Sequence, residues 1–576
     1  MSKARENLPQ RLLEYTVSQD YTLYTEIDQA VWRYVMKVSV PFFKKHAHKA
    51  YIEGLEMTGI PMDHIPHVDG MDKRLDKFNW GAVTVKGFIP PIIFMEFLSK
   101  KILPIAVDIR INEHITYTPA PDIIHEAAGH APIIADRDYA EYLCSYGEIA
   151  KKAIQSKEDS IQYDIIRKLS DMKEDPNADP NELKKIEEKF EKVFSEDHWI
   201  SEANELSKMN WWTIEYGLIG DLENPKIYGA GLLSSVGESL ECLNSKVKKI
   251  PMSIDCIDQD YNITEPQPQL FVTKSFKDLK DILIKYSKTM AFKTGGKSGI
   301  EKAINSKNVT TSVYDSGLQI SGTLTNYIND NNKEMTYLSF GGSVQLSYND
   351  SELEGHGTKY HSEGYGAAIG VLSKINLPLH QLNNNHLESL GIKENHKILL
   401  TFIGGLIVSG TVKKVLMIDD SPVLISLDNC SVKLNEDCLY KPEWGPYDLS
   451  CGGKIVSVFG GPADWDNYYN NNSPALGTPH QSTNLSKNNT ELNELYKQVR
   501  ILREDDRPSN DYLPILKKLY NEHPDDWLLC TEIYEIIYSD PSLVREKKEL
   551  KNYIKEFAKN KMLFSAINRF INLVEA

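Results

Sequence analysis

The chain has 576 residues and a mass of 65.5 kDa, and its 41% hydrophobic residues are enough to fill the cores of roughly three or four domains. Its net charge of −16 has no offsetting basic block, which argues against nucleic-acid binding because phosphate contacts need clustered Lys and Arg. The seven cysteines are scattered along the sequence, as is usual for free thiols in a reducing compartment. The residues after Met1 lack the hydrophobic core of a secretory signal, and no apolar run reaches the ~18 residues needed to span a bilayer. We therefore predict a cytoplasmic protein without membrane contact.

The segment Pro121–Pro132 contains two histidines, His125 and His130, five residues apart. Asp122 is suited to cap a short helix and Gly129 to end it. Residues five apart point roughly 140° away from each other on a continuous α-helix, so both imidazoles converge only if the backbone turns at Gly129. Zinc peptidases instead place their histidines four apart on one helical face. The spacing favours another kind of metal site, and ordinary hydrogen-bonded histidines are the alternative.

A charged segment, residues 151–197, is predicted to form a helical hairpin. Asp179 is placed to cap its second helix and Pro180 to occupy the first helical position. Two apolar stripes at helical spacing support the prediction: Ile161, Ile165, Ile166 and Leu169, then Leu183, Ile186, Phe190 and Val193. We interpret the hairpin as a surface elaboration in preference to a partner-binding element.

Glu215 lies inside the aromatic and apolar run Asn210–Leu218, where a carboxylate is costly unless a positive charge meets it. Two neutral imidazoles and one carboxylate leave about three octahedral positions open, as in non-haem Fe(II) oxygenases. A solvent-facing helix carboxylate is the alternative.

From about residue 301 to 460 the sequence is β-rich, with turn signals between runs of β-branched and aromatic residues. The predicted strands are Gly317–Tyr327, Met335–Tyr348, Lys397–Leu416 and Val423–Leu434. His356 and His361 lack a third ligand in the sequence, so we interpret them as structural. Residues 461–490 are predicted to be a polar linker, and residues 491–576 a helical region that either self-associates or docks on the preceding domains.

Three blocks in order resemble the tetrahydropterin-dependent aromatic amino acid hydroxylases: Thr118–Pro132, Trp212–Leu218, and Tyr228–Ser235 with Glu238. Val85–Pro91 and the residues after it resemble the prokaryotic phenylalanine-hydroxylating branch. The resemblance covers about residues 8–300 and implies a mainly α-helical catalytic domain, followed here by the β-rich domain and the C-terminal α-helical region. Asn210 and Ala120 depart from the family pattern, where Tyr and an acidic residue are common.

The resemblance implies that His125, His130 and Glu215 bind Fe(II), with Ser234 and Glu238 around the metal ligands. A hydroxyl such as that of Ser234 can orient a ligating imidazole. The resemblance also implies that a tetrahydropterin binds near Gly87, Phe94 and Glu126. Phe94 lies in the apolar run Ile92–Leu98, so ordinary packing is the alternative for it.

For the substrate, the resemblance implies that Arg110 clamps a carboxylate, as a planar guanidinium does well, although a surface salt bridge is the alternative. Thr118 and Ser234 would supply polar groups, while Pro121 and Trp211 would hold an aromatic ring. The expected reaction is hydroxylation of free L-phenylalanine to L-tyrosine with O2, because Val272 stands where tyrosine enzymes favour a polar group. Tyrosine or tryptophan hydroxylation, a zinc peptidase and a noncatalytic metal-stabilised interaction protein are the alternatives.

Overall fold

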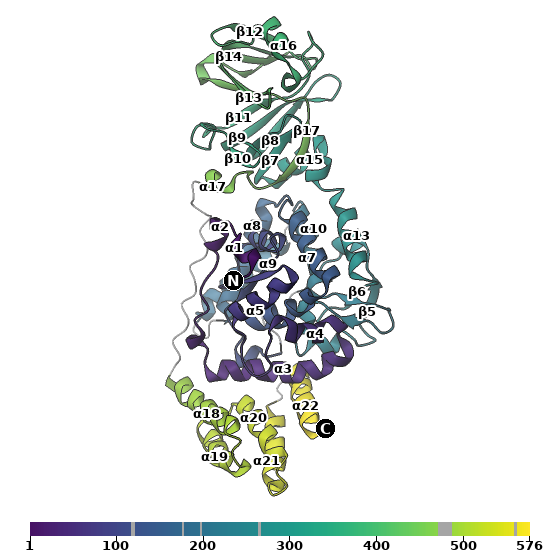
Figure 1. The fold of residues 1–576 in the computed structure, drawn as a ribbon, viewed down its shortest axis with the longest axis vertical. Coiled ribbons are helices and arrows are strands. Elements are labelled where there is room, and N and C mark those ends of the chain that lie inside the picture. Colours follow the sequence, from purple (N-terminus) through teal and green to yellow (C-terminus); the bar gives the residue numbers. More distant parts are fainter. Residues whose placement is uncertain (117–120, 175–177, 196–197, 263–265, 470–486, 558–560) are drawn as a thin grey trace.

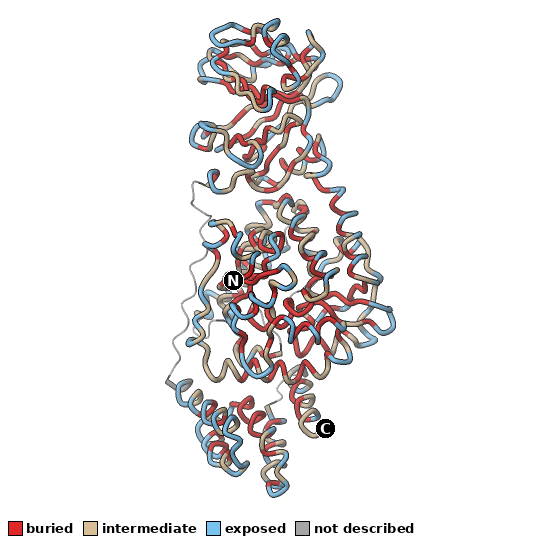
Figure 2. The backbone as a smooth tube through the Cα atoms, in the orientation of Figure 1, coloured by how far each residue is buried: buried red, intermediate tan, exposed pale blue. Residues whose placement is uncertain are grey.

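The computed structural model describes residues 1–576 except 117–120, 175–177, 196–197, 263–265, 470–486 and 558–560. Two β-sheets lie at one end of the long axis, a mainly helical part lies in the middle, and the C-terminal helices lie at the other end (Figure 1). Buried backbone is dense in the helical part, where the largest hydrophobic core lies (Figure 2).

Helix α3 (Glu26–His46) runs along the base of the helical part (Figure 1). Its start is set by a capping box, in which the Thr25 hydroxyl accepts from the Asp28 backbone while the Asp28 carboxylate accepts from the Thr25 backbone. The other longer helices here are α4 (Lys49–Thr58), α5 (Val68–Leu75), α6 (Pro91–Ser99), α7 (Arg137–Ala150), α10 (Glu202–Asn210) and α13 (Phe276–Ser287). The shorter ones are α1 (Lys3–Glu6), α2 (Gln10–Leu13), α11 (Ala230–Ser234) and α12 (Glu238–Glu241). Helices α14 (Ala291–Thr294) and α15 (Gly296–Ser306) pack against strands of the β-rich part.

Two small sheets position the loops of the helical part. Strands β1 (Gly81–Val85) and β2 (Ile102–Ala106) are parallel, so Gly87 and Arg110, which follow them, leave the sheet at the same edge. The second sheet has the order β4-β3-β6-β5, formed by β3 (Leu218–Ile219), β4 (Lys226–Ile227), β5 (Lys248–Pro251) and β6 (Gln269–Thr273).

The charged segment contains helices α8 (Lys157–Glu174) and α9 (Pro180–Ser195), which pack against each other. Asp179 accepts a hydrogen bond from the Asn181 backbone at 2.9 Å, as a capping residue does. An ion pair of 3.4 Å between Lys173 and Glu187 joins the two helices.

The β-rich residues form two sheets with separate hydrophobic clusters. The six-stranded sheet contains β7 (Val309–Tyr314), β8 (Leu318–Asn329), β9 (Met335–Tyr348), β10 (Ser351–Glu352), β11 (Tyr365–Ala368) and β17 (Ile455–Gly460). The five-stranded sheet contains β12 (Lys397–Thr401), β13 (Leu406–Ile418), β14 (Ser421–Leu434), β15 (Asp437–Tyr440) and β16 (Tyr447–Ser450), and α16 (Asn384–Ser389) lies before it in the chain. The predicted strand Lys397–Leu416 is therefore wrong as one strand: a turn containing Gly404 and Gly405 folds it into a hairpin, with Gly405 at a φ of 83°.

The short helix α17 (Trp465–Tyr468) follows β17, and most of the predicted linker, residues 470–486, lies outside the described residues. The C-terminal helices are α18 (Lys487–Glu504), α19 (Leu513–Glu522), α20 (Trp527–Tyr538), α21 (Val544–Glu556) and α22 (Lys561–Glu575).

These C-terminal helices pack against α3 through α18, α20 and α22. Arg500 forms two hydrogen bonds of 2.7 and 2.8 Å with Glu26, and Arg33 pairs with Glu532. Apolar side chains of the C-terminal helices belong to the same hydrophobic cluster as α3. The helices therefore dock within the chain, and their self-association stays a prediction, as do domain boundaries at residues 300, 460 and 490.

Within the described residues, every helix is too short or too polar to cross a bilayer. All seven cysteines are free thiols.

Candidate metal centre

The two histidines lie on one π-helix, Ile124–His130, and this differs from the expected turn at Gly129. A π-helix is closed by hydrogen bonds between residues five apart, so side chains at that spacing lie about one turn above each other. His125 and His130 therefore converge without a break in the helix, and their Nε2 atoms are 3.2 Å apart. Asp122 accepts a hydrogen bond from the His125 backbone at 2.9 Å, which agrees with its predicted capping role.

Gly129 serves close packing. A Cβ at Gly129 would lie 2.7 Å from the Ala230 carbonyl oxygen and 3.2 Å from its Cβ. Only glycine lets the π-helix approach α11 this closely, and α11 carries Ser234.

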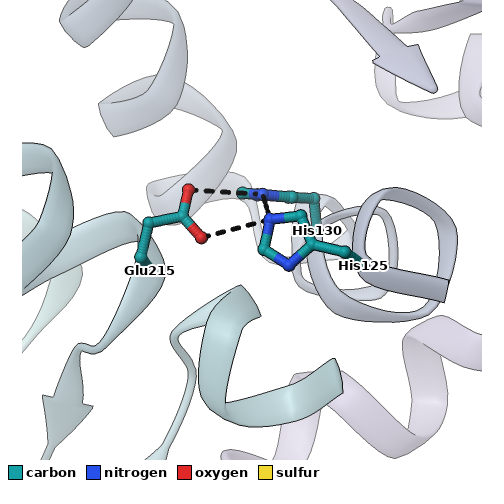
Figure 3. A group of neighbouring side chains, drawn as sticks. All are labelled: His125, His130 and Glu215. Carbon is teal, nitrogen blue, oxygen red and sulfur yellow. Dashed lines mark hydrogen bonds and ion pairs between the residues drawn. The ribbon is translucent and has the colours of Figure 1, made fainter. Parts of the chain in front are cut away.

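Glu215 ends a second π-helix, Trp211–Glu215, which continues α10. Its Oε2 lies 3.3 Å from His125 Nε2, and its Oε1 lies 3.5 Å from His130 Nε2 (Figure 3). Asn210 donates to Glu215 Oε1 at 3.4 Å, so the residue that departs from the family pattern supports the carboxylate. The three predicted ligands thus meet at one point with donor atoms 3.2 to 3.5 Å apart.

The electrostatics of this cluster suit a cation. Burial lowers the pKa of His130 to about 4. Burial alone would raise the pKa of Glu215, but the two imidazoles lower it to about 2. Burial would lower the pKa of His125, yet the Glu215 carboxylate raises it to about 9. The anionic carboxylate therefore stabilises a positive charge between the rings, and a divalent metal ion would take the place of that proton.

Ser234 fixes the tautomer of His125. Its hydroxyl donates to the Ala230 carbonyl at 2.8 Å and lies 3.0 Å from His125 Nδ1. With its hydrogen directed at Ala230, the Ser234 oxygen accepts the proton of Nδ1. Nε2, which faces Glu215, is then the ring atom at which a metal ion would replace the other proton. Glu238 lies farther out, where it accepts a 2.6 Å hydrogen bond from Tyr216.

Ser234→Ala should weaken iron binding by about 10- to 100-fold, because the ring of His125 loses the group that orients it. The measurement is an Fe(II) titration of the full-length apoprotein. Ser235→Ala is the matched control, since the hydrogen bonds of the Ser235 hydroxyl to described residues are with the Thr116 carbonyl and the Glu238 backbone, not with a histidine. Equal iron affinities for both variants would contradict the orienting role.

Arg110 is buried, with 1% of its side chain exposed, so the surface salt bridge is excluded for it. Its Nε and Nη2 donate to the two carboxylate oxygens of Asp122 at 2.7 and 2.8 Å, and its Nη1 donates to the Ser234 carbonyl at 3.0 Å. A guanidinium has five N–H groups, so two donors remain after these bonds to described residues. Asp122 was expected only as a cap, and its burial beside the histidines is a tertiary feature with no signal in the sequence.

The predicted ring-holding residues lie next to the cluster in the chain. Trp211 is half-buried between Tyr216 and Tyr261, whose rings stack on it at 4.4 and 4.3 Å. Its Nε1 is buried without a hydrogen-bond acceptor among the described residues. Pro121 is half-buried beside Asp122, and Thr118 lies outside the described residues.

The residues predicted to contact a pterin lie in the loop after β1 (Gly87), on α6 (Phe94) and on the π-helix (Glu126). Glu126 is adjacent to His125, its Oε2 lies 3.8 Å from His130 Nε2, and burial raises its pKa to about 8. That oxygen has no hydrogen-bond partner among the described residues. Gly87 has a φ of 57°, and its backbone N–H donates to the Asp108 carboxylate. The Asp108 backbone carbonyl accepts a hydrogen bond from Ile123, the residue just before the π-helix. Phe94 is half-buried on α6 among apolar residues.

Val272 lies on β6 and lines a cavity of about 600 Å³ formed with residues before β4, of β5 and of α13. None of the three residues of the metal cluster lines that cavity. Substrate choice based on Val272 therefore stays a prediction.

The family model for biopterin-dependent aromatic amino acid hydroxylases matches residues 2–164 and 195–334. This is more than half of the chain, which therefore belongs to the biopterin-dependent aromatic amino acid hydroxylase family. The predicted family is confirmed, and the chain is a pterin-dependent hydroxylase. The match stops within α8, after residue 164, and resumes at residue 195, the last residue of α9.

Curated relatives are named phenylalanine-4-hydroxylases. That of Mesorhizobium japonicum is 26% identical over 272 residues, covering 46% of this chain and 82% of the relative. That of Pseudomonas aeruginosa is 28% identical over 258 residues, covering 44% and 81%, and that of Rattus norvegicus is 27% identical over 273 residues, covering 46% and 50%.

Among solved structures, the phenylalanine hydroxylase of Chromobacterium violaceum with bound iron(III) and 7,8-dihydrobiopterin is 24% identical, with a TM-score of 0.39, covering 50% of this chain and 89% of that one. The cobalt-bound form of the same enzyme is 25% identical, with a TM-score of 0.36, covering 48% and 86%.

Proposed function

We propose that this chain hydroxylates free L-phenylalanine to L-tyrosine, using O2, Fe(II) and a tetrahydropterin. One oxygen atom enters the ring and the other leaves with the pterin, which supplies two electrons. The observation that carries the proposal is the convergence of His125, His130 and Glu215 with donor atoms 3.2 to 3.5 Å apart. The names of the relatives support phenylalanine as the substrate.

The donor set fits Fe(II), because two imidazoles and one carboxylate are the ligands of non-haem iron oxygenases. When bound, the iron and the pterin together supply the chemistry that activates O2. His125 and His130 on one π-helix and Glu215 on the other would hold the iron as its three protein ligands. Ser234 keeps His125 in the ligating tautomer, and Asn210 orients Glu215.

Arg110 is the proposed carboxylate site of the substrate. Asp122 and the Ser234 carbonyl take three of its N–H donors and hold the guanidinium in place. The two remaining donors suit a carboxylate, which they would bind in a forked geometry. The substrate's ring is then held at a fixed distance from the metal, with Pro121 and Trp211 as its proposed walls and Thr118 as a further polar group.

The proposed pterin contacts are Gly87, Phe94 and Glu126. The Oε2 atom of Glu126, which has no hydrogen-bond partner among the described residues, offers a hydrogen-bonding group beside the proposed metal ligands. Phe94 offers an aromatic face, and Gly87 admits a close approach because it has no side chain.

Anaerobic loading of the full-length chain with Fe(II), followed by tetrahydropterin, phenylalanine and O2, should yield tyrosine. The same assay with tyrosine and with tryptophan decides the alternatives within the family. Faster turnover of either of these amino acids would overturn phenylalanine as the substrate. Pterin-independent peptide hydrolysis in the presence of zinc would instead support the peptidase alternative.

A further inference from the structure

A second cluster of two histidines and one carboxylate lies in the β-rich part of the chain, beyond the residues matched by the family model. His356 and His361 lie between β10 and β11, and Asp448 lies on β16. The histidines again stand five residues apart, but here they occupy a loop. Asp448 supplies the third ligand that the sequence did not reveal.

We propose that His356, His361 and Asp448 form a second metal site, which binds Zn²⁺ and ties the two β-sheets together. His356 Nδ1 lies 3.4 Å from His361 Nε2, and Asp448 Oδ2 lies 3.8 and 3.9 Å from these two nitrogens. Tetrahedral zinc ligands with bonds of about 2.0 to 2.1 Å stand about 3.3 to 3.4 Å apart. A contraction of about half an ångström brings all three atoms to that geometry.

The carboxylate is held with one oxygen facing the imidazoles. Ser426 donates to Oδ1 of Asp448, so Oδ2 is the oxygen that both rings face. The ring of Tyr360 meets that of His361 edge to face at 4.7 Å. Hydroxyl groups that orient a ligating carboxylate are typical of built metal sites.

The backbones of the ligands are anchored to both sheets. The carbonyls of His356 and His361 accept hydrogen bonds of 2.9 Å from Leu346 and Val344 of β9. Asp448 pairs with Ser426 of β14 in the five-stranded sheet, and its carbonyl accepts from the Tyr365 hydroxyl of β11. A metal ion would therefore join a loop of the six-stranded sheet to a strand of the other.

Charge favours a cation here. The side chain of Asp448 is 1% exposed, and its ion pairs within the described residues are those with the two imidazoles. A divalent ion held between these three side chains would place a positive charge beside the buried carboxylate.

Zinc is the preferred ion because nitrogen and oxygen ligands at tetrahedral spacing suit it. Three protein ligands leave a fourth position. A water molecule would fill that position.

The test measures zinc in full-length His125→Ala protein, which lacks one ligand of the catalytic cluster. After chelator treatment, incubation with Zn²⁺ and buffer exchange, elemental analysis should find about one zinc per chain. Adding Asp448→Asn or His356→Gln should lower retention at least tenfold, with circular dichroism verifying the fold. Adding His396→Ala, an exposed histidine of the same part of the chain, should change nothing.

X-ray absorption of the zinc-loaded His125→Ala protein should show imidazole ligands. Retention far below one zinc, or retention unaffected by both Asp448→Asn and His356→Gln, would overturn the proposal. Because the background lacks His125, these outcomes are independent of hydroxylase activity.

Discussion

Replacing His125, His130 or Glu215 by alanine should abolish pterin-dependent tyrosine formation and release iron. Each residue is one of the three proposed protein ligands, and even residues that merely orient a ligand change metal affinity by about 10- to 100-fold. Loss of a ligand itself should therefore exceed about 100-fold. Iron per chain and tyrosine formation rate are the two measurements, both made on full-length protein.

Glu215→Ala should have the strongest effect on iron retention, because it removes the only charged ligand of the three. The variant keeps two neutral imidazoles in a buried site. A divalent ion bound there would have no negative ligand to balance its charge, so its binding should be weak. His64→Ala, at an exposed histidine on the same part of the chain, is the control and should keep full activity. Full activity in any one ligand variant would remove that residue from the centre.

The three candidate ligands were predicted from residue type, spacing and the family resemblance, but the geometry that unites them was not predicted. The α-helical period places His125 and His130 on different faces, so a turn at Gly129 was the simplest way to join them. The chain instead forms a π-helix, which depends on close packing against Ala230, about a hundred residues downstream. The sequence around His125 therefore does not predict that contact.

The same limit applies to groups whose partners are distant in sequence. Arg110 was assigned by resemblance, yet its fixation by Asp122 and the Ser234 carbonyl emerges only in three dimensions. The sequence did not predict a third ligand for His356 and His361, because Asp448 lies on strand β16, far from them in the sequence. Strand propensity found the stretch Lys397–Leu416 but missed the turn at Gly404 and Gly405 within it.

Asp122→Ala should destabilise the protein by about 3 to 5 kcal/mol, the usual cost of leaving one member of a buried ion pair without its partner. Among the described residues, Arg110 would keep only the Ser234 carbonyl as an acceptor while staying buried, and the π-helix would lose the acceptor for the His125 backbone. Chemical denaturation measures the free energy of unfolding. Arg110→Ala should cost a similar amount, so loss of activity in it alone does not establish substrate binding.

The double variant Arg110→Met with Asp122→Leu separates stability from substrate binding. Removing both charges takes away the penalty of an unpaired ion, so its free energy of unfolding should exceed that of either single alanine variant. If Arg110 binds the substrate carboxylate, the KM for phenylalanine should nevertheless stay raised by at least tenfold while iron remains bound. A normal KM in this variant would show that Arg110 serves only the fold, and the substrate carboxylate would then need another partner.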